Sequence, residues 1–311
     1  MLILEDSHLG SRLRLRALGG TLSVDCPAGG PRCESLMLQI LDEAGRERFK
    51  ETYPAPGLVR CDPPLNVSGA YFLRIYGKPP GVRLYYSLLG GRVGVPLWSD
   101  GRTVSLRASP FILSNRDFLR SLPTSGPFLR RSLEDTEDIQ SGDRTVRDLS
   151  RELSRGSLFP LSTIVKAYRW VAGNIAYDYD SLRSGRYRDE DFTALDMLRR
   201  RRGVCCGYHN LLAALLRASG IPAIGIDCCA LGVGTNGWWY QGKNLDMKPN
   251  HVITAAFGGQ RWHVMDVTWG SDLVYERGVR SRSGRLGPTL SFCDVTLPFL
   301  SLSHRLDKVA M

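Results

Sequence analysis

The chain has 311 residues, enough for about two domains at ~100–200 residues each. Its 43% apolar and 23% charged residues are typical of a globular protein and exclude global disorder. No apolar run approaches the ~18–20 residues that cross a bilayer, and acidic residues stand where a signal peptide would have its apolar core. As written, the sequence predicts a cytoplasmic protein without a membrane partner, or a secreted one if a leader had been trimmed.

Basic residues outnumber acidic ones by 41 to 31, which gives a formal charge of +10. Such a protein can bind nucleic acid or an anionic surface, but an ordinary basic protein explains the same charge. Nucleic acid is therefore not the partner that we expect. The densest basic run, Arg199 to Arg202, is predicted to be the solvated end of a helix.

The chain has eight cysteines, with two adjacent pairs and no Cys-x-x-Cys motif. Neighbouring residues in a helix or strand point apart, and eight cysteines in 311 residues are too few for a disulfide scaffold. We expect mostly reduced thiols, which agrees with a cytoplasmic address.

Residues 1–115 are predicted to form a β-rich, sandwich-like accessory domain. Short segments of β-branched, aromatic and leucine residues alternate with Gly, Pro and Asp, a spacing typical of an antiparallel sandwich. Residues 70–76 are a strand candidate, whereas 35–45 could be strand or helix. Residues 116–150 are rich in Ser, Pro, Gly, Arg and acidic side chains and are predicted to be a linker that can become helical towards Arg151.

The remainder, residues 151–311, begins with helical patterns and ends with strands. Helices are expected over residues 161–178, 192–201 and 205–220. Strands are expected over residues 223–231, 250–257 and 261–269, the last two joined by a turn at Gly258 and Gly259. Helices followed by antiparallel strands predict an α+β domain.

Three residues in this part have the types and order of a nucleophilic site. Cys205 begins a strong helix, where unpaired N–H groups and the helix dipole favour a thiolate. His251 begins one strand, and Asp266 lies in the next strand, across the two-glycine turn. Adjacent antiparallel strands can hold an imidazole beside a carboxylate, so the three residues could act as nucleophile, base and orienting acid.

These motifs resemble the transglutaminase-like superfamily. Its cysteine motif is similar to GVCCGYHNLLAALLRASGIPA at 203–223, and its histidine and aspartate strands are similar to NHVITAAFGGQRWHVMDVTWG at 250–270. The segment RWVAGNIAYDYD at 169–180 resembles the helix that precedes the cysteine motif in this family. The segment FCDVTLPFLSLSHR at 292–305 resembles the tail of its bacterial members. The resemblance covers about half of the chain, residues 160–305.

The resemblance implies that Cys205 is the nucleophile, His251 the general base and Asp266 the orienting carboxylate of a papain-like α+β catalytic domain. It implies acyl transfer or hydrolysis through a thioester, with no metal or organic cofactor and no calcium. The segment SGAYFLRIYG at 68–77 resembles the β module of kyphoscoliosis-peptidase-like proteins.

Nearby residues have competing interpretations. Cys206 is the alternative nucleophile. His263 is the alternative base, but it lies three residues from Asp266 and so faces the opposite side of the strand. His209 replaces a small residue of the family pattern, one turn after Cys205, and could perturb the thiolate or the substrate groove.

The remaining candidates are a metal site, a groove wall and oxyanion donors. A zinc site lacks the usual Cys-x-x-Cys knuckle, although it could use Cys205, Cys206, His209 and Cys228; Cys228 and Cys229 are expected to be buried strand residues. The loop at 232–242 is either a surface loop or a wall of the substrate groove, since its aromatic residues would form a costly exposed patch. Its substrate-binding candidates are Trp238, Trp239 and Tyr240. The Cys205 N–H is the natural oxyanion donor, and Asn174 and Tyr177 are candidates for a side-chain donor.

We therefore predict a transglutaminase-like cysteine hydrolase or acyltransferase, either a cysteine protease or a transglutaminase, that acts on a protein or peptide. The alternative is a catalytically idle transglutaminase-like module that binds protein or peptide in the same groove. A third and least favoured possibility is a binder of nucleic acid or an anionic surface that uses the arginines.

Overall fold

The structure is a computed structural model that describes residues 3–9, 13–27, 33–89, 94–185, 192–232, 235, 239, 242–282 and 287–310. It divides into two compact units. The first comprises Met1–Ile112, Leu231–Leu245 and Val295–Ser303. The second comprises Leu113–Ala230, Asp246–Asp294 and His304–Met311. The first unit thus includes two short segments from the part of the sequence assigned to the catalytic domain.

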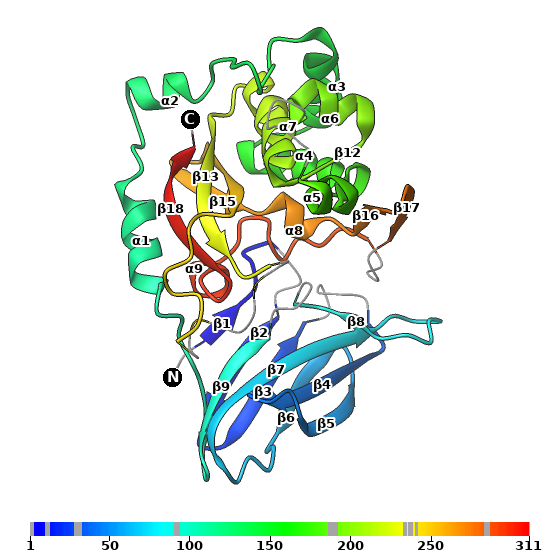
Figure 1. Ribbon diagram of the computed structural model, residues 1–311, viewed down its shortest axis with the longest axis vertical. Coiled ribbons are helices and arrows are strands. Elements are labelled where there is room, and N and C mark those ends of the chain that lie inside the picture. The colour runs from blue at the N-terminus through cyan, green and yellow to red at the C-terminus, as the bar shows by residue number, and fades with distance from the viewer. Residues whose placement is uncertain are drawn as a thin grey trace. The chain divides into compact units, whose positions relative to one another are not determined.

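The elements of the first unit are β1 (Ile3–Glu5), β2 (Arg14–Leu18), β3 (Thr21–Cys26), β4 (Ser35–Asp42), β5 (Glu47–Pro54), β6 (Gly57–Cys61), β7 (Ser68–Lys78), β8 (Tyr86–Ser87), β9 (Val95–Asp100), β10 (Val104–Leu106) and α9 (Leu297–Leu300). They form two antiparallel sheets, ordered β1-β2-β3-β6 and β10-β9-β7-β4-β5, with β8 paired to β7 (Figure 1). Every second residue of β3 and β4 is buried, so each sheet turns one apolar face inward. The β-rich first part is confirmed, and the ambiguous residues 35–45 form a strand.

The helices of the second unit are α1 (Ile112–Ser121), α2 (Pro127–Arg131), α3 (Arg144–Ser154), α4 (Pro160–Asn174), α5 (Tyr179–Ser184), α6 (Ala194–Arg200), α7 (Cys205–Ala218) and α8 (Val267–Gly270). Its strands are β11 (Ala176–Asp178), β12 (Arg202–Gly203), β13 (Ala223–Ala230), β14 (His251–Gly258), β15 (Arg261–Met265), β16 (Leu273–Glu276), β17 (Val279–Arg282) and β18 (His304–Ala310). Residues 116–150, predicted to be a linker, instead contain most of α1, all of α2 and the first part of α3, and belong to this unit.

A buried helix on an antiparallel sheet forms the centre of the second unit. The sheet has the order β15-β14-β13-β18, and α7 packs against β13 and β14 (Figure 1). Residues 207–216 of α7 are all buried, which explains the apolar character of this helix. Gly207 is required for close packing, because a Cβ there would lie 2.5 Å from the Met197 Sδ. The α+β class is confirmed.

The hairpin of β14 and β15 turns one residue later than predicted. Gly258 still pairs with Arg261, so the turn residues are Gly259 and Gln260, with φ of 59° and 67°. Positive φ at both central residues is the type I′ geometry that matches the twist of a hairpin. The second strand ends at Met265, and the residues predicted to continue it form the short helix α8.

A second sheet of this unit has the order β12-β11-β16-β17. Strand β11 is parallel to both β12 and β16, and β16 pairs with β17 as a hairpin. Strand β12 leads directly into α7, so this sheet fixes the direction from which the chain enters that helix.

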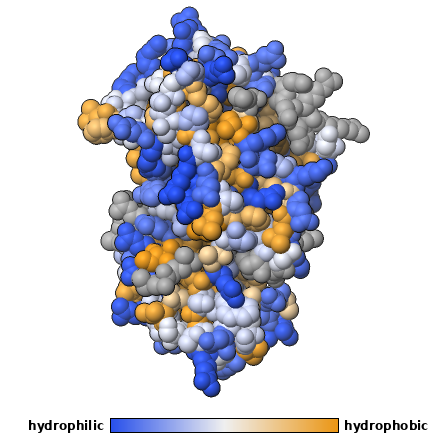
Figure 2. Space-filling view, turned by 90° about the vertical axis from the view of Figure 1, so that its left-hand side faces the viewer, coloured by the Kyte–Doolittle hydropathy of each residue, from blue (hydrophilic) through white to orange (hydrophobic). Residues whose placement is uncertain are grey.

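Within the described ranges, no helix is both long and apolar enough to span a membrane. On the face seen in Figure 2, polar and charged side chains surround smaller apolar patches. The cytoplasmic location stays a prediction.

Candidate active site

Cys205 is the first residue of α7, directly after Val204, which occupies the N-cap position. The N-cap offers no side-chain hydrogen bond to the first turn, so the backbone N–H groups there can serve an anion. The Cys205 thiol is free and partly exposed. Cys205 thus lies at a helix N-terminus, where the sequence predicted it.

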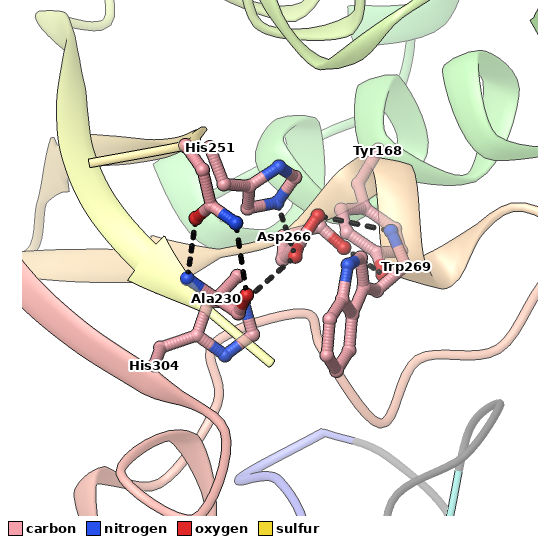
Figure 3. A network of polar contacts seen from close by, with 7 residues as sticks. Tyr168, Ala230, His251, Asp266, Trp269 and His304 are labelled. Carbon is pink, nitrogen blue, oxygen red and sulfur yellow. Dashed lines mark hydrogen bonds and ion pairs between the residues drawn. The ribbon is translucent and has the colours of Figure 1, made fainter. Parts of the chain in front are cut away.

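His251 and Asp266 lie in direct contact. The His251 Nε2 is 2.9 Å from the Asp266 Oδ2, and the aspartate side chain is fully buried (Figure 3). Asp266 is not a strand residue as predicted, because it follows β15 and caps α8 by accepting a hydrogen bond from the Trp269 N–H. This cap engages the Asp266 Oδ1 and leaves the Oδ2 for the imidazole.

The pKa values of Cys205 and His251 are shifted in opposite directions. Burial raises the pKa of Cys205, but the hydrogen bond and charge of His251, together with the Val252 N–H, outweigh it and lower that pKa. Burial lowers the pKa of His251, but Asp266 and then Cys205 raise it to about 10. Both shifts favour the thiolate–imidazolium form of the pair over the thiol and neutral imidazole.

The same interactions lower the pKa of Asp266. Its burial alone would raise that pKa, but His251 and His304 more than offset the penalty. Since the Nε2 of His251 faces the carboxylate, the Nδ1 is the ring nitrogen left for Cys205. The arrangement thus has the connectivity thiol, imidazole, carboxylate.

His304 is a residue of this cluster that the sequence analysis did not single out. Its Nε2 lies 3.1 Å from the Asp266 Oδ2, so one carboxylate oxygen contacts two imidazoles (Figure 3). His304 is fully buried at the start of β18, and its ring lies 4.7 Å from the indole ring of Trp269. Local spacing could not reveal it, because 37 residues separate it from Asp266; its only signal was its place in the tail motif.

The Asn115 side chain holds the main chain at His304 and Leu306. The Asn115 side chain of α1 donates to the His304 carbonyl, 2.8 Å away, and accepts from the Leu306 N–H. Helix α1 therefore lies along β18 on the side away from α7 (Figure 1).

The main chain at Asp266 is also held tightly. The Tyr168 hydroxyl of α4 donates to the Asp266 carbonyl at 3.2 Å. Gly270 allows this approach, because a Cβ there would lie 1.8 Å from the Tyr168 oxygen. The glycine of the DVTWG motif therefore has a packing role.

The two other histidines of this region lie outside the cluster. His263 contacts Asp294 through Nδ1 at 3.1 Å and the Gly258 carbonyl through Nε2 at 3.0 Å, so it faces away from Asp266 as predicted. His209 is buried and contacts the Thr254 hydroxyl at 3.0 Å. Burial, and then the charge of Arg217, lower the pKa of His209 to about 3, so its imidazole is neutral at physiological pH.

The remaining predicted residues have mixed outcomes. Trp239 is buried and packs edge-on against Phe111 in the first unit, at a centroid distance of 4.8 Å. Trp238 and Tyr240 lie outside the described residues, so the predicted groove wall stays a prediction. Cys228 and Cys229 are fully buried in β13, as expected.

Neither candidate for a side-chain oxyanion donor gains support. The Asn174 amide donates to the Trp170 carbonyl within its own helix. The Tyr177 ring packs on those of Tyr179 and Tyr208.

A metal site has to be weighed at the same place. Among the described residues, one group of three side chains that could ligate a metal has its ligand atoms within 4.8 Å of one another. It consists of His251, Asp266 and His304. Both imidazoles, however, direct Nε2 to the same carboxylate oxygen, and an imidazole that donates its proton there offers no lone pair at that nitrogen. The donor set fits a hydrogen-bonded cluster better than a metal centre.

The fold and this cluster define an α+β domain in which a helix N-terminus presents a cysteine to a histidine at the start of β14 and an aspartate that follows β15. Residues 147–267 match the model of the transglutaminase-like superfamily. This part of the chain is therefore similar to that superfamily.

Two curated proteins and one solved structure are similar to parts of this chain. Kyphoscoliosis peptidase of Mus musculus is 26% identical over 165 residues, which are 51% of this chain and 23% of the relative. The Homo sapiens protein of that name is 28% identical over 134 residues, 42% of this chain and 18% of the relative. Red sea bream transglutaminase aligns with a TM-score of 0.33 at 13% identity, over 80% of this chain and 48% of that one. The chain spans about a fifth of the length of these curated relatives.

Proposed function

We propose that the chain is a thiol-dependent enzyme that transfers or hydrolyses the acyl group of an amide in a protein or peptide. The observation that carries the proposal is the contact chain from Cys205 through His251 to Asp266 at the N-terminus of α7. The names of the two curated relatives, both called kyphoscoliosis peptidase, agree with this class of chemistry.

In the proposed reaction the Cys205 thiolate attacks the carbonyl carbon of a carboxamide or peptide bond. The negative charge that develops on the oxygen is stabilised by N–H groups of the first turn of α7, the Cys205 N–H among them. The His251 imidazolium then gives its proton to the leaving nitrogen, and a thioester remains on Cys205.

The second half of the reaction restores the enzyme. Neutral His251 takes a proton from water or from a primary amine, which attacks the thioester. The products are a carboxylic acid or a new amide, and the thiolate–imidazolium pair is regenerated. Asp266 holds the imidazole in one orientation and stabilises its charged form throughout.

The first test is selective alkylation followed by product analysis. A brief, sub-stoichiometric iodoacetamide pulse at neutral pH should modify Cys205 first, as peptide mapping would show. The label should disappear in Cys205→Ala and persist in Cys206→Ala, which removes the adjacent thiol instead. Slow labelling spread over several cysteines would contradict an activated nucleophile and favour an idle binding module.

Glutamine-containing peptides, incubated with and without a primary amine, then separate the possible products. Mass spectrometry distinguishes a cleaved peptide, a deamidated glutamine and an amine conjugate. Each product should be absent with Cys205→Ala. Formation of the same product by that variant would refute the assigned nucleophile.

A further inference from the structure

The second unit contains a pocket lined by four arginines that the proposed reaction does not use. The pocket has a volume of about 250 Å³, and its lining residues are Ala176, Arg200, Arg201, Arg202, Tyr275 and Arg280. They come from α6, the sheet β12-β11-β16-β17 and the residue between α6 and β12. The pocket contains most of the basic run that the sequence analysis assigned to a solvated helix end.

A helix end does not account for this grouping. Basic side chains at a helix C-terminus complement the helix dipole, which is a sufficient reason for Arg199 and Arg200 at the end of α6. Arg280, however, lies on β17, about 80 residues later in the chain. The tertiary fold therefore brings a separate cation to the same pocket.

Of two guanidinium groups in this pocket, those of Arg202 and Arg280, one has a close carboxylate among the described residues. Arg202 has its Nε 3.4 Å from the Asp178 Oδ2 and its guanidinium 3.8 Å from the centre of the Tyr275 ring. Arg280 donates to a neutral acceptor, the Asn174 carbonyl, at 2.7 Å. No acidic residue is among the described residues that line the pocket.

Arg201 supplies the most direct sign of a missing partner. Its guanidinium lies 4.7 Å from the centre of the Trp170 ring, and its Nη1 is buried with no hydrogen-bond acceptor among the described residues. A buried guanidinium nitrogen without an acceptor is costly unless a ligand supplies one. Burial, and then the charge of Arg280, lower the pKa of Arg201, which shows that the two cations repel each other.

We propose that this pocket binds a phosphoryl group, either as inorganic phosphate or as part of a small phosphorylated molecule. A phosphoryl oxyanion carries two charges and several acceptor oxygens, and forked guanidinium groups match that geometry. A monocarboxylate carries one charge and would leave more of the mutual repulsion in place. The site is separate from the Cys205 cluster and does not depend on its chemistry.

The test is a calorimetric titration of the full chain with sodium phosphate at low salt. Sodium chloride at matched ionic strength measures screening alone, and acetate measures the response to a single carboxylate. Pyrophosphate separates a preference for a larger phosphorylated molecule from one for the free ion. We expect saturable binding of phosphate or pyrophosphate that chloride and acetate do not reproduce.

Variants then assign the site. Arg280→Gln removes an exposed cation of the pocket, and Arg201→Lys keeps the charge but removes the fork. Each should weaken binding at least about tenfold, since a hydrogen bond to a charged group is lost. Arg199→Gln removes one charge from the same helix end but outside the lining, and should change affinity less than about twofold.

Two results would overturn the proposal. One is the absence of saturable heat with either phosphate compound. The other is an equal loss of affinity in all three variants, which belongs to a general positive field, or a loss in none of them, which places the binding at another site. Thermal unfolding in chloride buffer checks that each variant is folded, and Arg280→Gln, at an exposed strand position, tests the site even if Arg201→Lys does not fold.

Discussion

Replacing Asp266 by Asn should move the pH dependence of Cys205 reactivity to higher pH. Asp266 is the main reason that the pKa of His251 rises to about 10 despite its burial. A neutral amide in its place removes the largest contribution that raises the pKa of His251, so burial holds that pKa lower than in the wild type. A larger share of the imidazole is then neutral at a given pH, and the pKa of Cys205 is lowered less.

The magnitude follows from the thiolate fraction. Each unit by which the thiol pKa rises lowers the thiolate fraction about tenfold at any pH well below both the original and the raised pKa. We expect alkylation of Cys205 in Asp266→Asn to be slower at pH 6, by up to about tenfold for each unit of that rise. The two rates should converge only as the pH passes the raised thiol pKa of the variant. Nucleophilicity rises with thiol pKa, so the variant should not be slower above that point.

The assay is iodoacetamide alkylation across pH 5 to 10, read by intact mass and peptide mapping. Asp294→Asn is the matched control, because Asp294 is also buried and also holds an imidazole, that of His263 at 3.1 Å. It should leave the Cys205 profile unchanged. Coincident profiles for the wild type and a folded Asp266→Asn would refute the assigned role of the carboxylate.

Three further predictions follow from single contacts. His304→Ala removes one of the two imidazoles that contact the Asp266 Oδ2. It should slow alkylation of Cys205 at pH 6, by less than Asp266→Asn does, and His304→Gln should recover part of the rate. A folded alanine variant with the wild-type pH profile would show that His304 does not position the carboxylate. The pKa of His209 is lowered to about 3, so between about pH 6.5 and pH 3 its unfolded-state proton should cost roughly 1.4 kcal/mol of unfolding free energy per pH unit. Urea titrations at several pH values should show a steeper loss in the wild type than in His209→Asn by about this amount, and equal slopes would contradict it. Gly270→Ala would place a Cβ 1.8 Å from the Tyr168 oxygen and should lower the free energy of unfolding by about 1–3 kcal/mol. Gly173→Ala, whose Cβ would meet its nearest neighbour at 3.6 Å, should leave that free energy unchanged or raise it. Similar values for both variants in guanidinium denaturation would refute the packing argument.

Local sequence determined much of the second unit. The i, i+3, i+4 pattern of 161–178 and the Gly-Pro stop after 205–220 predicted α4 and α7 within a few residues. Those signals work because one face of each helix is buried and because glycine and proline end helices for steric reasons. The opposite orientation of His263 followed from strand periodicity alone.

The errors arose where a local signal competed with tertiary contacts. Residues 116–150 are polar enough to resemble a linker, yet their helices pack into the second unit. The predicted strand through 269 ends early, because Asp266 caps α8 by accepting from the Trp269 N–H.

The sequence by itself determined the class of the second domain and the order of Cys205, His251 and Asp266, because these depend on chain-local periodicity and on motifs of fixed spacing. Only the tertiary structure could decide that His304 shares the Asp266 oxygen and that Arg280 lies with Arg201 and Arg202. Both contacts join segments that are tens of residues apart, through strands whose pairing order no local pattern encodes. Burial then gives each contact its energetic weight, because charged groups removed from water must find partners in the fold or in a ligand.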